Sequence, residues 1–235
     1  MATSGKYGKY LRSLIVAGDY ICINVAYLTA CAVFNFYPDF YNYLVWAFIN
    51  ISYIPVSSIF SDTHNQRIIY ANHIVYKALE STLSHAIIFV ALLFFSNNID
   101  KIWVKQIVTI YLIMVVVMPI WWVVARKILK FYRSKGYNFR KVIIVGYGRS
   151  GKLLEKELQS DAGYGYKIMG IFDDNPAVAS TTTHYKGTTS EVEAFALKNY
   201  IDEIYCALPT TAEENIMSLT RFAEKNVIRF FIIPR

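Results

Sequence analysis

Charged residues and cysteines are scarce in this sequence, and each shortage excludes classes of protein. Asp, Glu, Lys and Arg together make up 17% of the 235 residues, whereas about 25% is usual for a soluble domain. Three cysteines are too few for the disulfide framework of a small secreted protein. No collagen-like or low-complexity tract is present. Hydrophobic residues make up 55% of the chain, so the composition indicates a membrane protein with a soluble portion attached.

The few charges are unevenly distributed, and their density changes near residue 130. Residues 1–130 hold 10 Lys and Arg and 5 Asp and Glu, whereas residues 131–235 hold 14 and 12. We therefore divide the chain into a four-helix transmembrane domain (1–130), a basic juxtamembrane linker (131–140) and a soluble domain (141–235).

Four stretches are long and apolar enough to be expected as membrane-spanning helices. They are Leu14–Phe34, Tyr43–Phe60, His73–Phe95 and Ile102–Ile128.

Asp19 and His85 fall inside the first and third stretches, and an ionisable residue within a membrane is a functional hypothesis by default. The simpler interpretation, which we favour, places Asp19 near the cytoplasmic interface, paired with a neighbouring helix or hydrated. For His85, the simpler interpretation is a hydrogen bond to a neighbouring helix.

The positions of Lys and Arg set the expected orientation, because cytoplasmic flanks carry an excess of both. Lys6, Lys9 and Arg12 precede the first stretch, and the loop at residues 35–42 has neither Lys nor Arg. Seven basic residues end or follow the fourth stretch: Arg126, Lys127, Lys130, Arg133, Lys135, Arg140 and Lys141. Both termini and the soluble domain are therefore expected in the cytoplasm. This basic run is expected to contact anionic lipid, which accounts for the net charge of +7 without nucleic acid as a partner.

The soluble domain begins with a glycine-rich motif typical of nucleotide-binding folds. Lys141–Val145 predicts a buried strand, Gly146-Tyr147-Gly148-Arg149-Ser150-Gly151 follows it, and Lys152–Ser160 has a helical pattern. This is G-x-G-x-x-G between a strand and a helix. The first glycine permits a tight turn, the second lets a phosphate approach, and the third allows the helix to pack closely. The amino end of the helix favours an anion, so Gly146, Gly148, Arg149, Ser150 and Gly151 are the predicted binding residues.

Strands alternate with helices through the rest of the domain. We expect strands at Lys167–Phe172, Glu203–Leu208 and Val227–Ile233, and helices at Thr188–Asn199 and Ala212–Asn226. This order predicts a small α/β Rossmann-like domain with a parallel sheet, similar to nucleotide- or CoA-binding domains. Asp173 follows the second strand, where it either binds a ribose hydroxyl or belongs to a turn, since Asp-Asp-Asn-Pro favours turns. Both interpretations stay open.

The sequence offers few residues for catalysis. Leu153 stands where a Walker A motif needs Ser or Thr for magnesium. No His and Cys cluster has the spacing of metal ligands, and neither a Tyr-x-x-x-Lys pair nor a Ser-His-Asp set is apparent. We therefore assign no catalytic residue and no metal ligand. The ligand of the glycine loop is left open between a nucleotide and a nucleotide-sugar, and a homo-oligomer is also left open.

Several segments resemble one bacterial family, the polyprenyl-phosphate (undecaprenyl-phosphate) glycosyl-1-phosphate transferases that initiate exopolysaccharide and capsule synthesis. The resemblance rests on Tyr132–Lys141, on Val142–Gly151, on Gly165–Asp174 with its Gly-Tyr and Gly-Ile-Phe-Asp-Asp, and on Ala207-Leu208-Pro209. It implies a multi-pass protein of the bacterial cytoplasmic (inner) membrane. It also implies that the chain is the anchoring and regulatory N-terminal half of an enzyme that moves a sugar 1-phosphate from a UDP-sugar, often UDP-glucose, to undecaprenyl phosphate.

The resemblance places catalysis outside this chain. In such enzymes an acidic pair and magnesium belong to a later domain, so the chain alone is expected to be inactive. Two alternatives stay open. Membrane-bound nucleotide-sugar dehydratases and epimerases share this first half, and the chain could instead be a self-contained membrane protein that senses a nucleotide.

Overall fold

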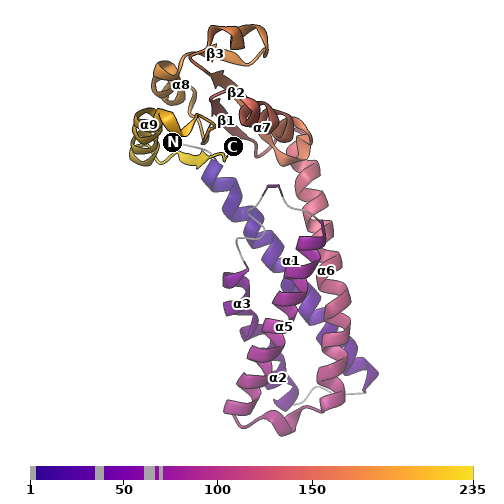
Figure 1. Ribbon diagram of the computed structural model, residues 1–235. Coiled ribbons are helices and arrows are strands. Elements are labelled where there is room, and N and C mark those ends of the chain that lie inside the picture. The colour runs from indigo at the N-terminus through magenta and orange to yellow at the C-terminus, as the bar shows by residue number, and fades with distance from the viewer. Residues whose placement is uncertain (1–3, 35–39, 61–66, 69–70, 235) are drawn as a thin grey trace. The chain divides into compact units, whose positions relative to one another are not determined.

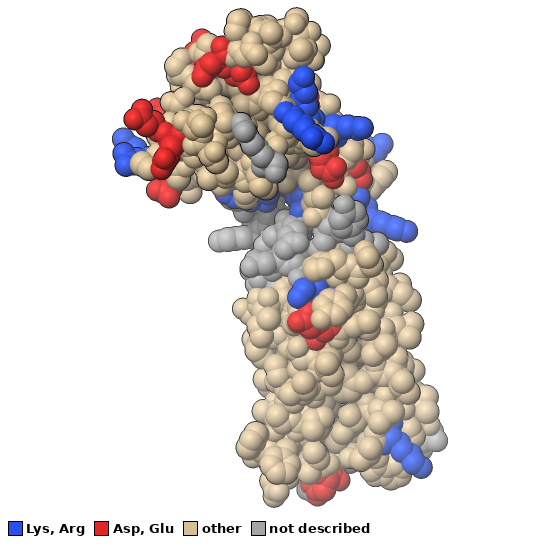
Figure 2. Space-filling model, in the orientation of Figure 1, with Lys and Arg blue, Asp and Glu red and all other residues tan. Residues whose placement is uncertain are grey.

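The computed structural model describes residues 4–34, 40–60, 67–68 and 71–234. The chain forms two compact units (Figure 1). One, the helical unit, spans Gly8–Leu129, and the other, the α/β unit, is built on the residues from Lys130 onward. On the face shown in Figure 2, charged residues are sparse over the helical unit and more frequent over the α/β unit. Residues 35–39 of the predicted first loop, and the side chains of Lys6, Lys9 and Arg12, lie outside what the structure describes.

Three helices of the described residues are long and apolar enough to cross a membrane. Their qualifying stretches are Ser13–Val33, Asn72–Phe95 and Val104–Ser134, which correspond to the first, third and fourth predicted stretches. The helices themselves are α1 (Ser4–Val33), α5 (Ala71–Phe95) and α6 (Val104–Ser134). Helix α6 therefore runs through the first residues of the predicted linker.

The second predicted stretch is divided into two shorter helices, α2 (Phe40–Ile51) and α3 (Tyr53–Ile59). The break has a local cause, because Pro55 has no backbone N–H to donate to the carbonyl of Ile51. Ser52 at the break donates its hydroxyl to the Ile49 carbonyl, with 3.0 Å between the oxygens. His85 Nε2 on α5 lies 2.9 Å from the same carbonyl oxygen and 2.9 Å from Ser52 Oγ. The side chains of Ser52 and His85 therefore both contact the Ile49 carbonyl beside the break.

Polar side chains are buried inside the helical unit in hydrogen-bonded sets. Asp19 on α1 is 1% exposed, and its carboxylate accepts from the Tyr53 hydroxyl on α3 at 2.8 Å and from Trp122 Nε1 on α6 at 2.9 Å. His85 is also buried, and its Nδ1 lies 3.2 Å from the Tyr111 hydroxyl on α6. The expected pairing of Asp19 and the expected interhelical hydrogen bond of His85 are both confirmed.

The α/β unit contains a five-stranded parallel sheet of order β3-β2-β1-β4-β5. The strands are β1 (Arg140–Val145), β2 (Tyr166–Phe172), β3 (Tyr185–Gly187), β4 (Glu203–Cys206) and β5 (Arg229–Ile232). The longer helices are α7 (Arg149–Gln159), α8 (Val192–Asn199) and α9 (Glu213–Lys225). Short 3-10 helices of this unit stand at Ala162–Tyr164, Pro176–Ser180, Thr189–Glu191 and Thr210–Ala212, and one more, Ile99–Lys101, lies in the helical unit. Each of the four expected strands is present, and β3 was not predicted because its three residues form no apolar run.

Helices cover the sheet through apolar side chains at alternating strand positions. Ile143 and Val145 of β1 and Ile204 of β4 pack with buried residues of α8 and α9, among them Ala196 and Leu219. Helix α7 packs against β1 and β2. Strand β1 is central and buried from Val142 to Val145, so the residues that follow it leave the sheet from the middle of its core.

A buried carboxylate joins three strands near the amino-terminal edge of the sheet, which is the edge opposite to the end of β1 from which the glycine loop leaves. Glu203 on β4 is fully buried, and its Oε1 lies 2.6 Å from Arg140 Nη1 on β1 and 3.1 Å from Arg229 Nη2 on β5. The Tyr205 hydroxyl donates to its Oε2 at 2.8 Å. Burial and the neighbouring Glu203 carboxylate raise the pKa of Tyr205 well above its usual range.

Replacing this carboxylate should destabilise the α/β unit. In Glu203→Ala, Arg140 loses its carboxylate partner while it stays largely buried, with a side chain that is 18% exposed. We expect a loss of about 2 kcal/mol, below the range for fully buried pairs because Arg229 is half exposed. Proteolysis of the full chain in detergent across a urea series measures the change. Glu224→Ala, at an exposed position on α9, is the matched control, and equal stability of the two variants would contradict the prediction.

Candidate functional site

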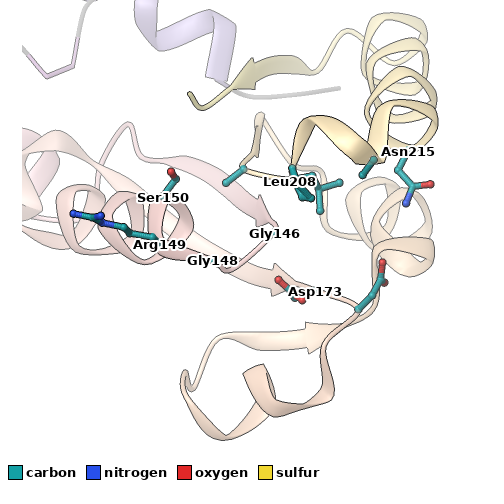
Figure 3. Close-up of a pocket in the computed structure, with 11 residues that line it drawn as sticks. Gly146, Gly148, Arg149, Ser150, Asp173, Leu208 and Asn215 are labelled. Carbon is teal, nitrogen blue, oxygen red and sulfur yellow. The ribbon is translucent and has the colours of Figure 1, made fainter. Parts of the chain in front are cut away.

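A cleft of about 630 Å³ lies at the carboxyl ends of β1 and β4 (Figure 3). Its volume falls within the roughly 300–1,000 Å³ of small-molecule sites. The connection after β1 leads to β2 on one side, whereas β4 and β5 lie on the other side. Ligands of open parallel sheets bind at such a point, where the strand order reverses. The lining residues are Gly146, Gly148, Arg149, Ser150, Asp173, Asp174, Ala207, Leu208, Pro209, Ala212 and Asn215.

The first and third glycines of the loop are required by close backbone contacts. Gly146 has a φ of +91°, and a Cβ there would lie 2.8 Å from the backbone nitrogen of Leu208. A Cβ on Gly151 would overlap the carbonyl oxygen of Gly146. The absence of both side chains therefore lets the end of β4 and the first turn of α7 approach the loop closely.

The second glycine has a different environment. Apart from Gly148 itself and its two chain neighbours, nothing lies within 4 Å of the position that a Cβ on Gly148 would take, although Gly148 lines the cleft. It is the N-cap of α7, and no side chain caps the helix there. The first backbone N–H groups of a helix have no acceptor within the helix, and the helix dipole adds a partial positive charge. This end of the cleft therefore offers hydrogen-bond donors to an anion.

Tyr147, between the first two glycines, is held at both of its ends. Its backbone N–H donates to Asp173 Oδ2 at 2.6 Å, and its hydroxyl donates to the Glu155 carboxylate on α7. The other oxygen of Glu155 lies 3.1 Å from Thr182 Oγ1 and 3.1 Å from His184 Nδ1. Burial and the hydrogen bond to Glu155 raise the pKa of Tyr147. The glycine loop is thus tied to α7 and to the segment between β2 and β3.

Asp173 lines the cleft, but both of its oxygens already accept backbone hydrogen bonds. Oδ2 accepts from Tyr147, and Oδ1 accepts from the N–H of Asn175 at 2.8 Å. The second contact is the expected turn after β2. Asp174 is held as well, since its Oδ1 accepts from the backbone N–H of Thr189 at 2.9 Å. A role of Asp173 toward ribose stays a prediction, while its contact with the glycine loop is observed.

Arg149 and Ser150 occupy the first two positions of α7 beside the cleft. The Arg149 side chain is exposed, and in Figure 3 it points away from Leu208 and Asn215. Ser150 Oγ donates to the carbonyl oxygen of Pro234 at 3.2 Å. The backbone of these residues therefore faces the cleft more directly than the Arg149 guanidinium does.

The opposite wall of the cleft was not assigned from the sequence. It is built by Ala207, Leu208 and Pro209 after β4, and by Ala212 and Asn215 at the start of α9. The sequence predicted the end of a strand at Leu208, close to the observed end of β4 at Cys206. No local sequence pattern marks Asn215. In the part of the chain that the structure describes, no three His, Cys, Asp or Glu side chains lie together as metal ligands do.

Two comparisons with known proteins bear on this arrangement. Residues 64–234 match the model of a family described as a CoA-binding domain, which is well over half of the chain. A stretch of 109 residues is 27% identical to UDP-glucose:undecaprenyl-phosphate glucose-1-phosphate transferase from Klebsiella pneumoniae. That stretch covers 46% of this chain but only 23% of the relative.

Alanine substitutions should separate the roles of two loop glycines. Gly148→Ala should fold as stably as the unchanged chain, because its Cβ enters open space at a φ of −71°. Gly151→Ala should lose about 1–3 kcal/mol, because the Cβ forces α7 away from Gly146. Amide hydrogen exchange along α7, measured on the full chain, reports both effects. Equal exchange in the two variants would show that the contact between Gly151 and Gly146 is not needed.

Proposed function

The chain belongs to the CoA-binding domain family, and we propose that it is the membrane-anchored, ligand-binding part of a sugar-1-phosphate transferase. The transferase assignment is supported by the similarity to the Klebsiella pneumoniae protein, whose name states UDP-glucose as donor and undecaprenyl phosphate as acceptor. Because the aligned stretch is 23% of that relative, the catalytic residues and any magnesium are assigned to parts that this chain does not align with.

One observation carries the binding role, namely the cleft at the reversal of strand order with the uncapped amino end of α7 in its wall. We assign the α/β unit to a Rossmann-like nucleotide-binding fold, a choice supported by the strand order β3-β2-β1-β4-β5. The ligand that fits is a phosphate-bearing nucleotide such as coenzyme A or a nucleotide-sugar. Gly148 leaves room for the phosphate, the backbone N–H groups of Arg149 and Ser150 donate to it, and Asp173 holds the loop.

We further propose that the helical unit crosses the cytoplasmic membrane of a bacterium four times. Helices α2 and α3 together form the remaining crossing, because Phe40–Ile59 covers about 20 residues, which is roughly 30 Å of helix. The break at Ser52 then lies within the membrane, where the side chains of Ser52 and His85 contact the Ile49 carbonyl. An even number of crossings puts the α/β unit in the cytoplasm, together with the basic run.

The binding proposal predicts that Gly148→Val abolishes ligand binding without unfolding the chain. The branched side chain would fill the space that a phosphate needs. Titration of the full chain in detergent with coenzyme A, UDP-glucose and NAD, followed calorimetrically, identifies the ligand and measures the loss. Ala162→Val, at an exposed position outside the cleft, is the control. Normal affinity in Gly148→Val would refute the loop as the binding site.

The transferase proposal predicts that the chain alone forms no lipid-linked sugar phosphate. Purified chain, undecaprenyl phosphate, magnesium and UDP-glucose carrying a labelled sugar are incubated, and label in the organic phase is counted. Turnover by the chain alone would overturn the assignment of catalysis to other parts of the enzyme. Saturable nucleotide binding by a gene product that ends at residue 235 would instead favour a membrane-bound sensor.

A further inference from the structure

We propose that the end of α6 and the amino-terminal edge of the sheet form one surface that lies against anionic lipid headgroups. This aromatic–basic collar consists of Phe131, Tyr132, Lys135, Tyr137, Phe139 and Lys167, all in the α/β unit. The sequence indicated only the basic run as a lipid contact, whereas the collar adds exposed aromatic rings and a lysine from β2. The inference rests on the membrane location in the proposed function, but it does not depend on the ligand of the cleft.

The distribution of charge along α6 places Phe131, the first residue of the collar, at the depth of the headgroups. Lys105 and Arg126 enclose 20 residues without Asp, Glu, Lys or Arg, and these make roughly 30 Å of helix, the thickness of the hydrocarbon core. Phe131 follows Arg126 by five residues, or about 8 Å. Headgroup regions add about 5–8 Å on each side of the core, so Phe131 lies at the outer, water-facing side of the headgroups.

The collar has a defined shape after the helix ends. The rings of Tyr132 and Tyr137 stack with centroids 4.9 Å apart, and Lys135 Nζ lies 5.3 Å from the centre of the Phe131 ring. Gly136, with a φ of +85°, permits the turn that brings the chain back along the helix. Phe131 is 65% exposed and Tyr137 is 57% exposed, so these large rings are presented to the surroundings.

Strand β2 contributes from a distant part of the sequence. Because the strands are parallel, the amino ends of β1 and β2 share one edge, with Lys141 paired to Lys167. Lys167 Nζ lies 5.7 Å from the centre of the Phe139 ring. A cation beside an exposed ring is the pairing expected at a membrane interface, where both lie among the headgroups and the cation meets phosphate.

Two acidic groups near the collar are paired with cations, and a third, Asp202, accepts from the backbone N–H of Lys141. Asp161 pairs with Lys130 at 2.6 Å, and Glu203 pairs with Arg140 and Arg229. Within the described residues neither Lys135 nor Lys167 has a carboxylate partner. The collar therefore presents a positive surface. The partner of complementary charge is the phosphate of an anionic lipid, whereas a neutral polar partner carries no such charge.

Hydrogen exchange in nanodiscs tests the collar on the full chain. Nanodiscs of phosphatidylcholine alone are compared with nanodiscs that also contain phosphatidylglycerol, and exchange is followed by mass spectrometry over residues 131–141 and 166–170. We expect roughly fivefold to tenfold slower exchange when the anionic lipid is present. Lys135→Gln/Lys167→Gln should lose this difference, whereas the control Lys198→Gln/Lys225→Gln, at exposed helix positions, should keep it.

The remaining arms separate the sources of the effect. Tyr137→Ala/Phe139→Ala should exchange faster than the unchanged chain even in phosphatidylcholine, because the rings would no longer anchor the segment. Equal protection by inorganic phosphate in neutral nanodiscs would assign the lysines to a free anion and overturn the lipid assignment. Identical exchange in both kinds of nanodisc, with the chain still recovered in them, would overturn the collar and leave the proposed membrane anchoring untouched.

Discussion

Backbone segments approach each other closely at the carboxyl end of β1, and the arrangement of the α/β unit depends on this contact. The carbonyl of Gly146 faces the first turn of α7 at Gly151, and the other side of Gly146 meets the backbone after β4. No side chain fits at either contact, so the loop, helix α7 and strand β4 are fixed relative to one another. The cleft lies where these three segments meet. Its shape therefore follows from backbone packing more than from the choice of side chains in its walls.

The glycine loop could be predicted because its signature is local. A β-branched strand, three spaced glycines and a helical pattern stand within some twenty residues, and the structure has β1, the loop and α7 in that order. The wall formed by Asn215 could not be predicted, because it depends on how α9 returns to the sheet. The same holds for Lys167, which meets Phe139 only through strand pairing. The contact of Asp173 with Tyr147 depends on the direction of one backbone N–H, which no sequence pattern specifies.

The helical unit shows a related limit of sequence reasoning. The apolar stretches identified α1, α5 and α6, yet the polar residues within them determine how the helices fit together. Asp19, Tyr53 and Trp122 come from three helices and meet in one hydrogen-bonded set. In an apolar surrounding each unpaired polar group is costly, so a rotation of any of the three helices would expose an unsatisfied donor or acceptor. Polar residues that weaken the apolar pattern thereby specify one packing arrangement among many.

The two attachments of Tyr147 have a thermodynamic consequence for any ligand of the cleft. Ordering a loop residue costs roughly 1–2 kcal/mol of conformational entropy, and here Asp173 and Glu155 already hold the residue between the first two glycines. That entropy is lost when the chain folds rather than when the ligand arrives. Association should therefore resemble the filling of a rigid receptor, in which the ligand's own lost freedom and the displaced water dominate the entropy change. A loop of three glycines would otherwise be among the most flexible parts of the molecule, and two carboxylates make it one of its fixed points.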